Sequence, residues 1–350
     1  MNLPTSMTAA VLFKLNNNLK ILNLEIPKLK KGQVLVKVFY SAICRSQIEE
    51  IYSGRENKKF LPHLLGHEGS GKVLAVGRGV SKIKVGDDVI LTWINSKGLD
   101  SVNPEYFYKN KKINSGKVTT FSNYTIVSEN RLVKKPKYIN FKNAVLLGCC
   151  LMTGSGMVFN DLKIKKNNKI VVIGLGAVGL SVLLSLKKLG IKNKNIVLIE
   201  NNKKKIFIAK KIGIKKIFNK INNITTKEIF KFFKDKADIC FESAGKTKTI
   251  EYAMKIIKKD GRVHFASHPN FKDYIKIYPH DLISGKKISG TWGGGCLPDR
   301  DISRSGLLIK VNSSLFKKIL NKEYNLNNIN KAVNDFKKND IFRPIIRMEH

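Results

Sequence analysis

The chain has few cysteines, few acidic residues and no long apolar run. Its five cysteines are an odd number in a chain of 350 residues, which argues against a disulfide framework. No apolar segment reaches the roughly 18 residues that a membrane-spanning helix needs, and residues 1–10 lack the charged-then-apolar order of a signal peptide. We therefore expect a cytoplasmic protein without a membrane partner, in which some cysteines have a chemical role.

The scarcity of acidic residues leaves a large positive charge. There are 26 acidic and 65 basic residues, which give a formal net charge of +39 and make nucleic-acid binding a function to weigh. The lysines, however, are spread along the whole chain among many asparagines and isoleucines, with no basic tail and no basic stripe interleaved with aromatic residues. This pattern favours a general composition bias over a nucleic-acid partner, although the charge could also steer anionic substrates.

A glycine-rich turn lies between a predicted strand and a predicted helix. Residues 170–173 form a short apolar run, GLGAVG follows at 174–179, and apolar residues then recur at helical spacing to 189. In a dinucleotide-binding turn the first glycine allows a sharp exit from the strand, the second admits the pyrophosphate and the third permits close helix packing. The predicted cofactor-binding residues of this turn are Gly174, Gly176, Val178 and Gly179.

An acidic residue follows at the distance that this motif requires. A second apolar run at 196–199 ends on Glu200, about twenty residues beyond the last glycine. A carboxylate at that place accepts hydrogen bonds from the adenosine ribose hydroxyls and repels a 2′-phosphate. The sequence therefore predicts NAD rather than NADP as the cofactor.

The two parts of the chain differ in pattern. Up to about residue 144 the sequence consists of short β-branched runs separated by turns, which is typical of a barrel or sandwich, and 96–117 is predicted to be a long surface loop. From about residue 153 strands and helices alternate, as in a doubly wound parallel sheet whose last strand is predicted near 287–291. A helix is predicted near 305–310 in the C-terminal tail.

Three separate segments carry residues that bind soft or borderline metals. They contain Cys44, His67 and the adjacent pair Cys149 and Cys150. Two thiolates and one imidazole leave the fourth position of a tetrahedral zinc open, as a catalytic site requires. Each residue alone would more often be an ordinary core or hydrogen-bonding group.

These motifs together resemble the medium-chain dehydrogenases of the zinc alcohol dehydrogenase type over nearly the whole chain. The resemblance rests on ICRSQ, GHEGSGKVLAVG, VGDDV, GCCLMTG, GLGAVG, Glu200 and FESAG, in that order. It implies an α/β protein with a GroES-like β-barrel catalytic domain at 1–152, a Rossmann domain with a doubly wound parallel sheet at 153–291, and a C-terminal return to the catalytic domain at 292–350. Relatives form homodimers or homotetramers by joining Rossmann sheets edge to edge, which makes 287–291 the candidate edge.

The resemblance also implies roles for individual residues. Cys44, His67 and Cys149 match the ligands of one catalytic zinc, Cys149 being preferred to Cys150 because it directly follows Gly148. Three further residues match catalytic positions. Glu68 matches the acid beside the zinc, which becomes a ligand in some relatives, and Ser46 matches the hydroxyl that receives the substrate's proton. Glu49 occupies the position of the usual relay histidine. Four more match cofactor contacts: Arg45 and Arg343 at the pyrophosphate, Lys205 near the adenosine ribose and Thr153 at the nicotinamide.

Several positions depart from the family pattern. Residues 96–117 lack the four cysteines that hold a structural zinc in relatives, so we expect one zinc per chain. With Glu49 in place of the relay histidine, the proton must leave through Glu49, water or another route. Gln47 stands where many relatives have an acid that orients the histidine ligand, and its amide is expected to accept a hydrogen bond from the imidazole N–H.

The predicted function is hydride transfer between NAD and an alcohol. Gln47, Glu49 and the polar, glycine-rich stretch at 291–303 favour a polyol or sugar derivative as the substrate. Two alternatives remain open: a zinc-less NADPH-dependent quinone or enone reductase of the same superfamily, and, less favoured, a nucleic-acid-binding protein.

Overall fold

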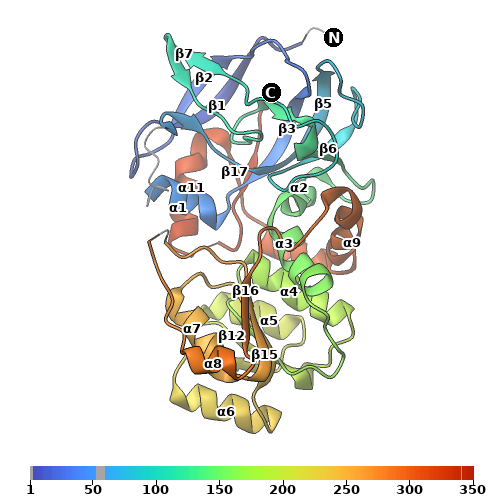
Figure 1. Cartoon of the computed structure of the whole chain (residues 1–350). Helices are drawn as coiled ribbons and strands as arrows, with labels where there is room; N and C mark the ends of the chain where they lie inside the picture. Colours follow the sequence, from blue (N-terminus) through green and yellow to red (C-terminus); the bar gives the residue numbers. More distant parts are fainter. Residues whose placement is uncertain (1–2, 53–59, 271, 340) are drawn as a thin grey trace. The chain divides into compact units, whose positions relative to one another are not determined.

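The computed structural model describes residues 3–52, 60–270, 272–339 and 341–350 (Figure 1). The chain divides into two compact units. The first comprises Met1–Cys150 and Leu297–His350, and the second comprises Leu151–Cys296. Each unit has its own β-structure and its own hydrophobic core.

The first unit is built mainly on antiparallel β-structure, with one parallel pair, β17 with β18. Its elements are β1 (Ser6–Leu12), β2 (Lys20–Glu25), β3 (Gln33–Ala42), α1 (Arg45–Tyr52), β4 (His63–Leu64), β5 (Glu68–Val76), β6 (Asp88–Thr92), β7 (Tyr106–Tyr108), β8 (Lys111–Ile113), β9 (Tyr124–Ser128), η2 (Glu129–Arg131), β10 (Leu132–Lys134), α2 (Phe141–Ala144), η3 (Val145–Gly148), α9 (Pro298–Val311), α10 (Ser313–Ile319), β17 (Glu323–Asn325), η6 (Leu326–Asn328), α11 (Ile329–Lys337) and β18 (Ile345–Arg347). Three sheets result: β2-β1-β4, the hairpin β7-β8, and a seven-stranded sheet in the order β10-β6-β5-β3-β18-β17, with β9 also paired to β3.

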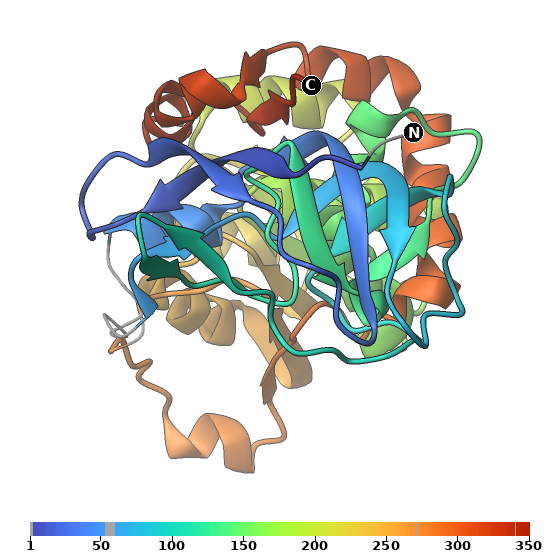
Figure 2. The ribbon, with the colours of Figure 1, turned by 90° about the horizontal axis from the view of Figure 1, so that it is seen from above.

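Strand β3 is the centre of this unit. It pairs with β5, β9 and β18, and its valines at positions 34, 36 and 38 all face one core, as the two-residue period of a strand requires. The C-terminal strand β18 joins the N-terminal half of the chain in this way, and Figure 2 shows the red C-terminal segment beside the blue strands. Helix α11 packs on the same core through Ile329, Ala332, Val333 and Phe336, which recur at helical spacing.

The second unit is a parallel sheet with helical crossovers. Its elements are α3 (Cys150–Gly156), whose first residue belongs to the first unit, then η4 (Met157–Asp161), β11 (Ile170–Ile173), α4 (Ala177–Lys188), η5 (Asn193–Asn195), β12 (Ile196–Ile199), α5 (Lys203–Lys211), β13 (Lys216–Phe218), α6 (Asn223–Phe233), β14 (Ala237–Glu242), α7 (Thr247–Ile256), β15 (Ile257–Phe265), α8 (Pro279–Ile283) and β16 (Lys287–Gly290). The strand order is β13-β12-β11-β14-β15-β16, and every pairing is parallel.

This order is that of two mononucleotide-binding halves that meet between β11 and β14. Helices α6 and α7 cover one face of the sheet, where Ile229, Phe233 and Ala253 pack against alternate residues of the central strands. The predicted α/β fold with a doubly wound parallel sheet is therefore confirmed. A sheet of this kind binds ligands outside the carboxyl ends of its strands, at the point where the order reverses.

Two sequence predictions differ from the structure. The segment at 96–117, predicted to be a loop, contains the hairpin β7-β8, whose Tyr106 and Ile113 are fully buried in a small core beneath β1 and β2. Three-residue strands are too short to give a periodic pattern in sequence. The helix predicted at 305–310 is the longer α9, which begins at Pro298, a favoured residue for the first helical position.

Among the residues that the structure describes, no single helix is long and apolar enough to span a membrane; only the bent pair Phe141–Gly148 and Cys150–Asp161 together would pass by length and composition.

Candidate metal centre and dinucleotide turn

Four potential metal ligands from three separate segments come together in the first unit. Cys44 lies between β3 and α1, His67 and Glu68 lie at the start of β5, and Cys149 follows η3. One side-chain ligand atom from each of these four residues lies within 4.8 Å of those of the others. The pairing of β3 with β5 brings the first three residues together, since Ser41 is opposite Gly69 in the ladder.

Gly148 allows Cys149 to reach this cluster. A Cβ atom at position 148 would lie 2.4 Å from the Leu91 carbonyl oxygen and 2.8 Å from the Glu68 Cβ, which is too close for any other residue. The Gly148 carbonyl also accepts a hydrogen bond of 2.8 Å from the Thr92 hydroxyl. The backbone before Cys149 is therefore fixed against β5 and β6.

The cluster fits a zinc ion in donor chemistry and spacing. The Sγ atoms of Cys44 and Cys149 are 3.9 Å apart, close to the separation of about 3.8 Å that two thiolates on a tetrahedral zinc would have with Zn–S distances near 2.3 Å. The His67 Nε2 atom is buried and has no hydrogen-bond partner among the described residues. A buried ring nitrogen without a partner is costly unless it binds a ligand, and a metal would satisfy it.

Glu68 and Arg343 form a buried ion pair beside the two cysteines. Glu68 is fully buried, Arg343 is 4% exposed, and Arg343 Nη2 donates to Glu68 Oε1. Burial raises the pKa of Glu68 to about 7, although the guanidinium opposes this effect. Between the two thiols, the hydrogen bond from Cys149 lowers the pKa of Cys44, and the same bond raises the pKa of Cys149.

The side chain of Gln47 has the opposite orientation from the one expected at the histidine. Its Oε1 accepts the Gly66 N–H at 2.5 Å, its Nε2 donates to Glu50 Oε2 at 2.9 Å, and the same Nε2 lies 3.3 Å from His67 Nδ1. Because a backbone N–H faces the amide oxygen and a carboxylate faces the amide nitrogen, the amide cannot be reversed without placing like groups together. In this structure the Gln47 nitrogen therefore faces the ring, and the expected hydrogen bond from the imidazole to Gln47 is not formed between these two side chains. Zinc on His67 Nε2 would put the ring proton on Nδ1 and favour the amide oxygen there, so this hydrogen bond stays a prediction for the zinc-bound site.

The other site residues of the first unit lie on the first turns of α1 and in the C-terminal segment. Ser46 Oγ is buried and has no hydrogen-bond partner in the described part of the chain, which leaves it available to a substrate hydroxyl. Glu49 is half-buried one turn further along α1, and Arg45 is exposed. Arg343 was predicted to contact pyrophosphate; its guanidinium is engaged by Glu68, and that contact remains a prediction.

The glycine turn of the second unit has the properties that a phosphate site needs. Gly174 has a φ of +88°, and a Cβ at Gly179 would lie 2.1 Å from the Gly174 carbonyl oxygen. A Cβ at Gly176 would meet nothing within 4 Å, so space is open beside the turn. Gly176 is the N-cap of α4 and offers no capping side chain. The first backbone N–H groups of α4, which include Val178, can therefore bind an anion.

Glu200 joins the turn to the end of β12. Its Oε2 accepts the Leu175 N–H at 2.6 Å, its Oε1 accepts the Asn202 N–H at 2.8 Å, and the residue is 8% exposed. Lys205 lies in the first turn of α5, where the Asn202 side chain caps its backbone N–H at 3.1 Å. Glu200 thus contacts the glycine turn, and Lys205, on α5, and the buried Thr153, on α3, belong to the same unit.

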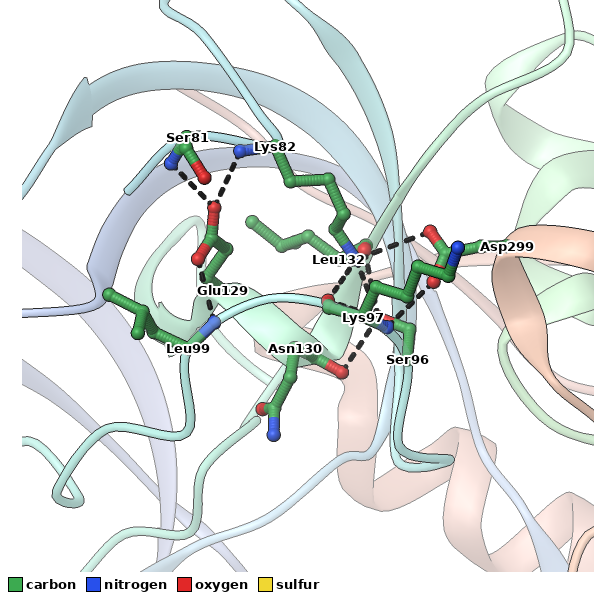
Figure 3. Close-up of polar contacts among 9 residues, drawn as sticks. All are labelled: Ser81, Lys82, Ser96, Lys97, Leu99, Glu129, Asn130, Leu132 and Asp299. Carbon is green, nitrogen blue, oxygen red and sulfur yellow. Dashed lines mark hydrogen bonds and ion pairs between the residues drawn. The ribbon is translucent and has the colours of Figure 1, made fainter. Parts of the chain in front are cut away.

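A polar network holds the loop that lacks the four cysteines (Figure 3). The buried Glu129 carboxylate accepts three backbone N–H groups, from Ser81, Lys82 and Leu99, at 2.7 to 2.8 Å. The Lys82 ammonium donates to Ser96 Oγ at 2.6 Å, to the Lys97 carbonyl oxygen at 2.5 Å and to Asp299 Oδ1 at 3.3 Å. Backbone and side-chain hydrogen bonds therefore tie this loop to η2 and to α9.

Comparison with known proteins gives consistent matches. Residues 30–137 match the family model "Alcohol dehydrogenase GroES-like domain", and residues 177–305 match "Zinc-binding dehydrogenase". The chain is 30% identical over 326 residues to Alcohol dehydrogenase 6 of Peromyscus maniculatus, covering 85% of each chain. It is 29% identical over 317 residues to the S-(hydroxymethyl)glutathione dehydrogenase of Escherichia coli (strain SMS-3-5 / SECEC), covering 82% of this chain and 85% of the relative.

Solved structures have the same fold. The benzyl alcohol dehydrogenase from Acinetobacter calcoaceticus superimposes with a TM-score of 0.85 at 24% identity, covering 98% of this chain and 99% of the other. The 2R,3R-butanediol dehydrogenase from Bacillus subtilis superimposes with a TM-score of 0.78 at 24% identity and the same coverage. At this level of identity the likeness concerns the fold.

Proposed function

Because this chain belongs to the medium-chain, zinc-dependent alcohol dehydrogenases, we propose that its metal cluster and glycine turn carry out NAD-linked oxidation of a hydroxylated substrate. The observation that carries this proposal is the convergence of Cys44, His67 and Cys149, with the His67 Nε2 atom lacking any other partner among the described residues. A cluster of core residues without a ligand would not leave a buried ring nitrogen unsatisfied.

Cys44, His67 and Cys149 would hold the zinc ion. When bound, zinc supplies a Lewis acid that polarises the substrate oxygen and lowers the pKa of its hydroxyl group. Glu68 lies within reach of the same position, and its second carboxylate oxygen has no partner in the described part of the chain. The pair that Glu68 makes with Arg343 holds this oxygen near the ligands without requiring it to coordinate.

The proton of the alcohol would leave through α1. Ser46 is two residues beyond Cys44, and its hydroxyl can accept the substrate's proton while donating its own. Glu49 is the next acidic group along the same helix and is half-buried, so it can pass a proton from the interior to solvent. Glu49 is therefore the proposed proton relay, at the position where relatives have the relay histidine.

Within the second unit, the N–H groups at the start of α4 suit the pyrophosphate, and Glu200 with Lys205 suits the adenosine ribose. Arg45 and Arg343 have guanidinium groups of the kind that bind phosphate oxygens, and their contact with the cofactor stays a prediction. Thr153 would contact the nicotinamide. Glu200 favours NAD, because a 2′-phosphate would meet its carboxylate.

We place a polyol or sugar derivative first among the substrates. Asp299 is engaged by Lys82 and Lys97, and Asp301 by Arg300 and Arg304, so the acidic groups of 291–303 serve the fold of the first unit. The preference therefore rests mainly on Glu49. Steady-state turnover with NAD should give a higher kcat/KM for a vicinal diol than for a primary alcohol of the same carbon skeleton, and equal values would contradict this choice.

A homodimer through β16 is the proposed assembly. This strand ends the sheet order on one side, and exposed apolar side chains lie on the neighbouring α8 and just before it: Tyr278, Leu282 and Ile283. An edge strand with apolar neighbours is a surface that a second copy can extend and cover. Light scattering should give twice the 39.5 kDa chain mass; a monomer at micromolar concentration would contradict the assignment.

A further inference from the structure

A buried histidine–aspartate pair in the second unit has no role in the chemistry described so far. His264, on β15, is 3% exposed, and both of its ring nitrogens are engaged. Its Nε2 lies 2.9 Å from Asp161 Oδ2, at the end of η4, and its Nδ1 lies 2.9 Å from Ser289 Oγ, on β16. His264 and Ser289 are opposite each other in the parallel pairing of β15 with β16, so this contact follows directly from the register.

Asp161 is linked through Thr291 to the glycine segment that follows β16. The Thr291 hydroxyl donates to Asp161, and its oxygen accepts the Gly294 N–H at 3.1 Å. Although burial opposes it, hydrogen bonds from His264 and Thr291 hold the pKa of Asp161 below its usual range. The carboxylate is therefore ionised and serves as a fixed acceptor for both partners.

The glycine segment itself is tightly enclosed. Gly293, Gly294 and Gly295 have φ values of +78°, +70° and +55°, a conformation that favours glycine. A Cβ at Gly294 would lie 2.3 Å from the Thr153 carbonyl oxygen, and one at Gly295 would lie 2.4 Å from Asp161 Oδ1. The segment can keep this shape only while Asp161 and the helix that carries Thr153 hold their places.

This segment lies where the second half of a dinucleotide must bind. In a sheet made of two mononucleotide halves, the glycine turn after β11 takes the pyrophosphate, and the second nucleoside extends over the carboxyl ends of β14, β15 and β16. Residues 291–295 follow the carboxyl end of β16 directly. Their backbone N–H and C=O groups are therefore candidate partners of the nicotinamide.

We propose that Asp161, oriented by His264, is a positioning residue that fixes the backbone at 291–295 as the receptor for the nicotinamide half of NAD. The proposal rests on NAD binding by the glycine turn. It assigns no chemical step to either residue. It predicts that loss of the Asp161 carboxylate weakens binding of the nicotinamide half while leaving binding of the adenosine half unchanged.

The test is calorimetric titration of the purified protein with NADH and, separately, with ADP-ribose, which lacks the nicotinamide. Asp161→Ala should weaken NADH binding about tenfold, the equivalent of about one hydrogen bond, and leave ADP-ribose affinity unchanged. Asp161→Asn should restore most of the NADH affinity, because an amide can accept from Thr291 and donate to His264 Nε2. Asp238→Ala is the matched control, since Asp238 is a paired acid at the amino end of β14 in the same unit.

If Asp161→Ala fails to fold, Thr291→Val is a second variant that keeps the side-chain volume. It is also expected to weaken NADH binding and to leave ADP-ribose affinity unchanged. Equal affinity of variant and wild type for NADH would overturn the proposal. An equal loss for both ligands would also overturn it, because it would show a general structural role. If the wild-type protein bound neither ligand, the NAD assignment itself would fail.

Discussion

His67 has one ring nitrogen facing the Gln47 amide and the other without a partner in the described structure. Single residues of this kind carry most of the functional argument, because each has a polar atom whose surroundings make sense only with a ligand present. Glu200, in the second unit, supports the cofactor assignment in a different way. Its carboxylate is oriented by two backbone N–H groups at the glycine turn, so its charge has a fixed place beside the predicted ribose.

Removal of that charge should change cofactor preference. Glu200→Gln keeps the side-chain shape but no longer repels a 2′-phosphate, so NADPH affinity should rise about tenfold and NADH affinity should fall a few-fold. Fluorescence titration of both cofactors measures the two affinities, with Glu228→Gln on α6 as the control because its acid is paired with Lys216 at the surface. Unchanged affinities in Glu200→Gln would show that this carboxylate does not select the cofactor.

The sequence predicted which potential metal ligands come together, but not the partners of the neighbouring side chains. Cys44, His67 and Cys149 were found because their types and flanking glycines match a known metal chemistry. The pairing of Glu68 with Arg343 joins positions 275 residues apart, and that of Asp161 with His264 joins positions 103 residues apart. No local pattern connects such residues, so neither pair could be read from the chain. The orientation of Gln47 depended on Gly66 and Glu50, which no composition or spacing argument identifies.

At the level of elements, local signals were strongest where a strand, a turn and a helix follow one another. The strand–helix–strand segment β11–α4–β12 was predicted from its apolar runs and its glycines, and the parallel order of the whole sheet agrees with that prediction. The hairpin β7-β8 was missed because its strands have three residues each. Helix α9 was predicted too short, although Pro298 followed by Asp299 and Asp301 is a helix-start signal.

The loop held by Glu129 provides a test at this level. Glu129→Gln would place an amide N–H group against backbone donors, which should lower the free energy of unfolding of the first unit by about 1–3 kcal/mol. Burial opposes ionisation of Glu129, but three backbone hydrogen bonds hold its pKa below the usual value. A lowered folded-state pKa gives stability that is present above the unfolded-state pKa, near 4.5, and is lost as the pH falls through the folded-state value.

The difference in stability between wild type and Glu129→Gln should therefore be largest near neutral pH and should shrink as the solution is acidified below about pH 4.5. Urea unfolding at several pH values measures it. Glu105→Gln is the control, because Glu105 forms only exposed ion pairs with Lys30 and Lys112. A difference that did not change with pH would show that the Glu129 charge does not hold the loop.

For the whole molecule, the net charge of +39 and the two-unit organisation are the dominant features. Many lysines form ion pairs with acids or lie above aromatic rings, as Lys216 lies above Phe218 and Lys337 above Tyr52. The rest are distributed over both units. This arrangement agrees with a composition bias and a small-molecule enzyme.

Nucleic-acid binding should accordingly be weak at physiological salt. Fluorescence polarisation with a labelled RNA should show no saturable binding below about 10 µM at roughly 150 mM salt, since non-specific contacts give affinities of this order or weaker. Binding at low salt should fall steeply as salt is added, and added RNA should not displace NADH. Submicromolar binding at physiological salt would revive the nucleic-acid alternative.

The central claim is that Cys44, His67 and Cys149 hold one zinc ion per chain, and metal analysis of purified protein tests it most directly. Wild type should contain about one zinc per chain, and Cys44→Ala should lose it, because only His67 and Cys149 of the three proposed ligands remain and Glu68 is held by Arg343. Cys240→Ala, which removes a buried cysteine of the parallel sheet, should keep the full zinc content. Retention of zinc by Cys44→Ala, or its absence from wild type, would contradict the account and return these cysteines to the hydrophobic core.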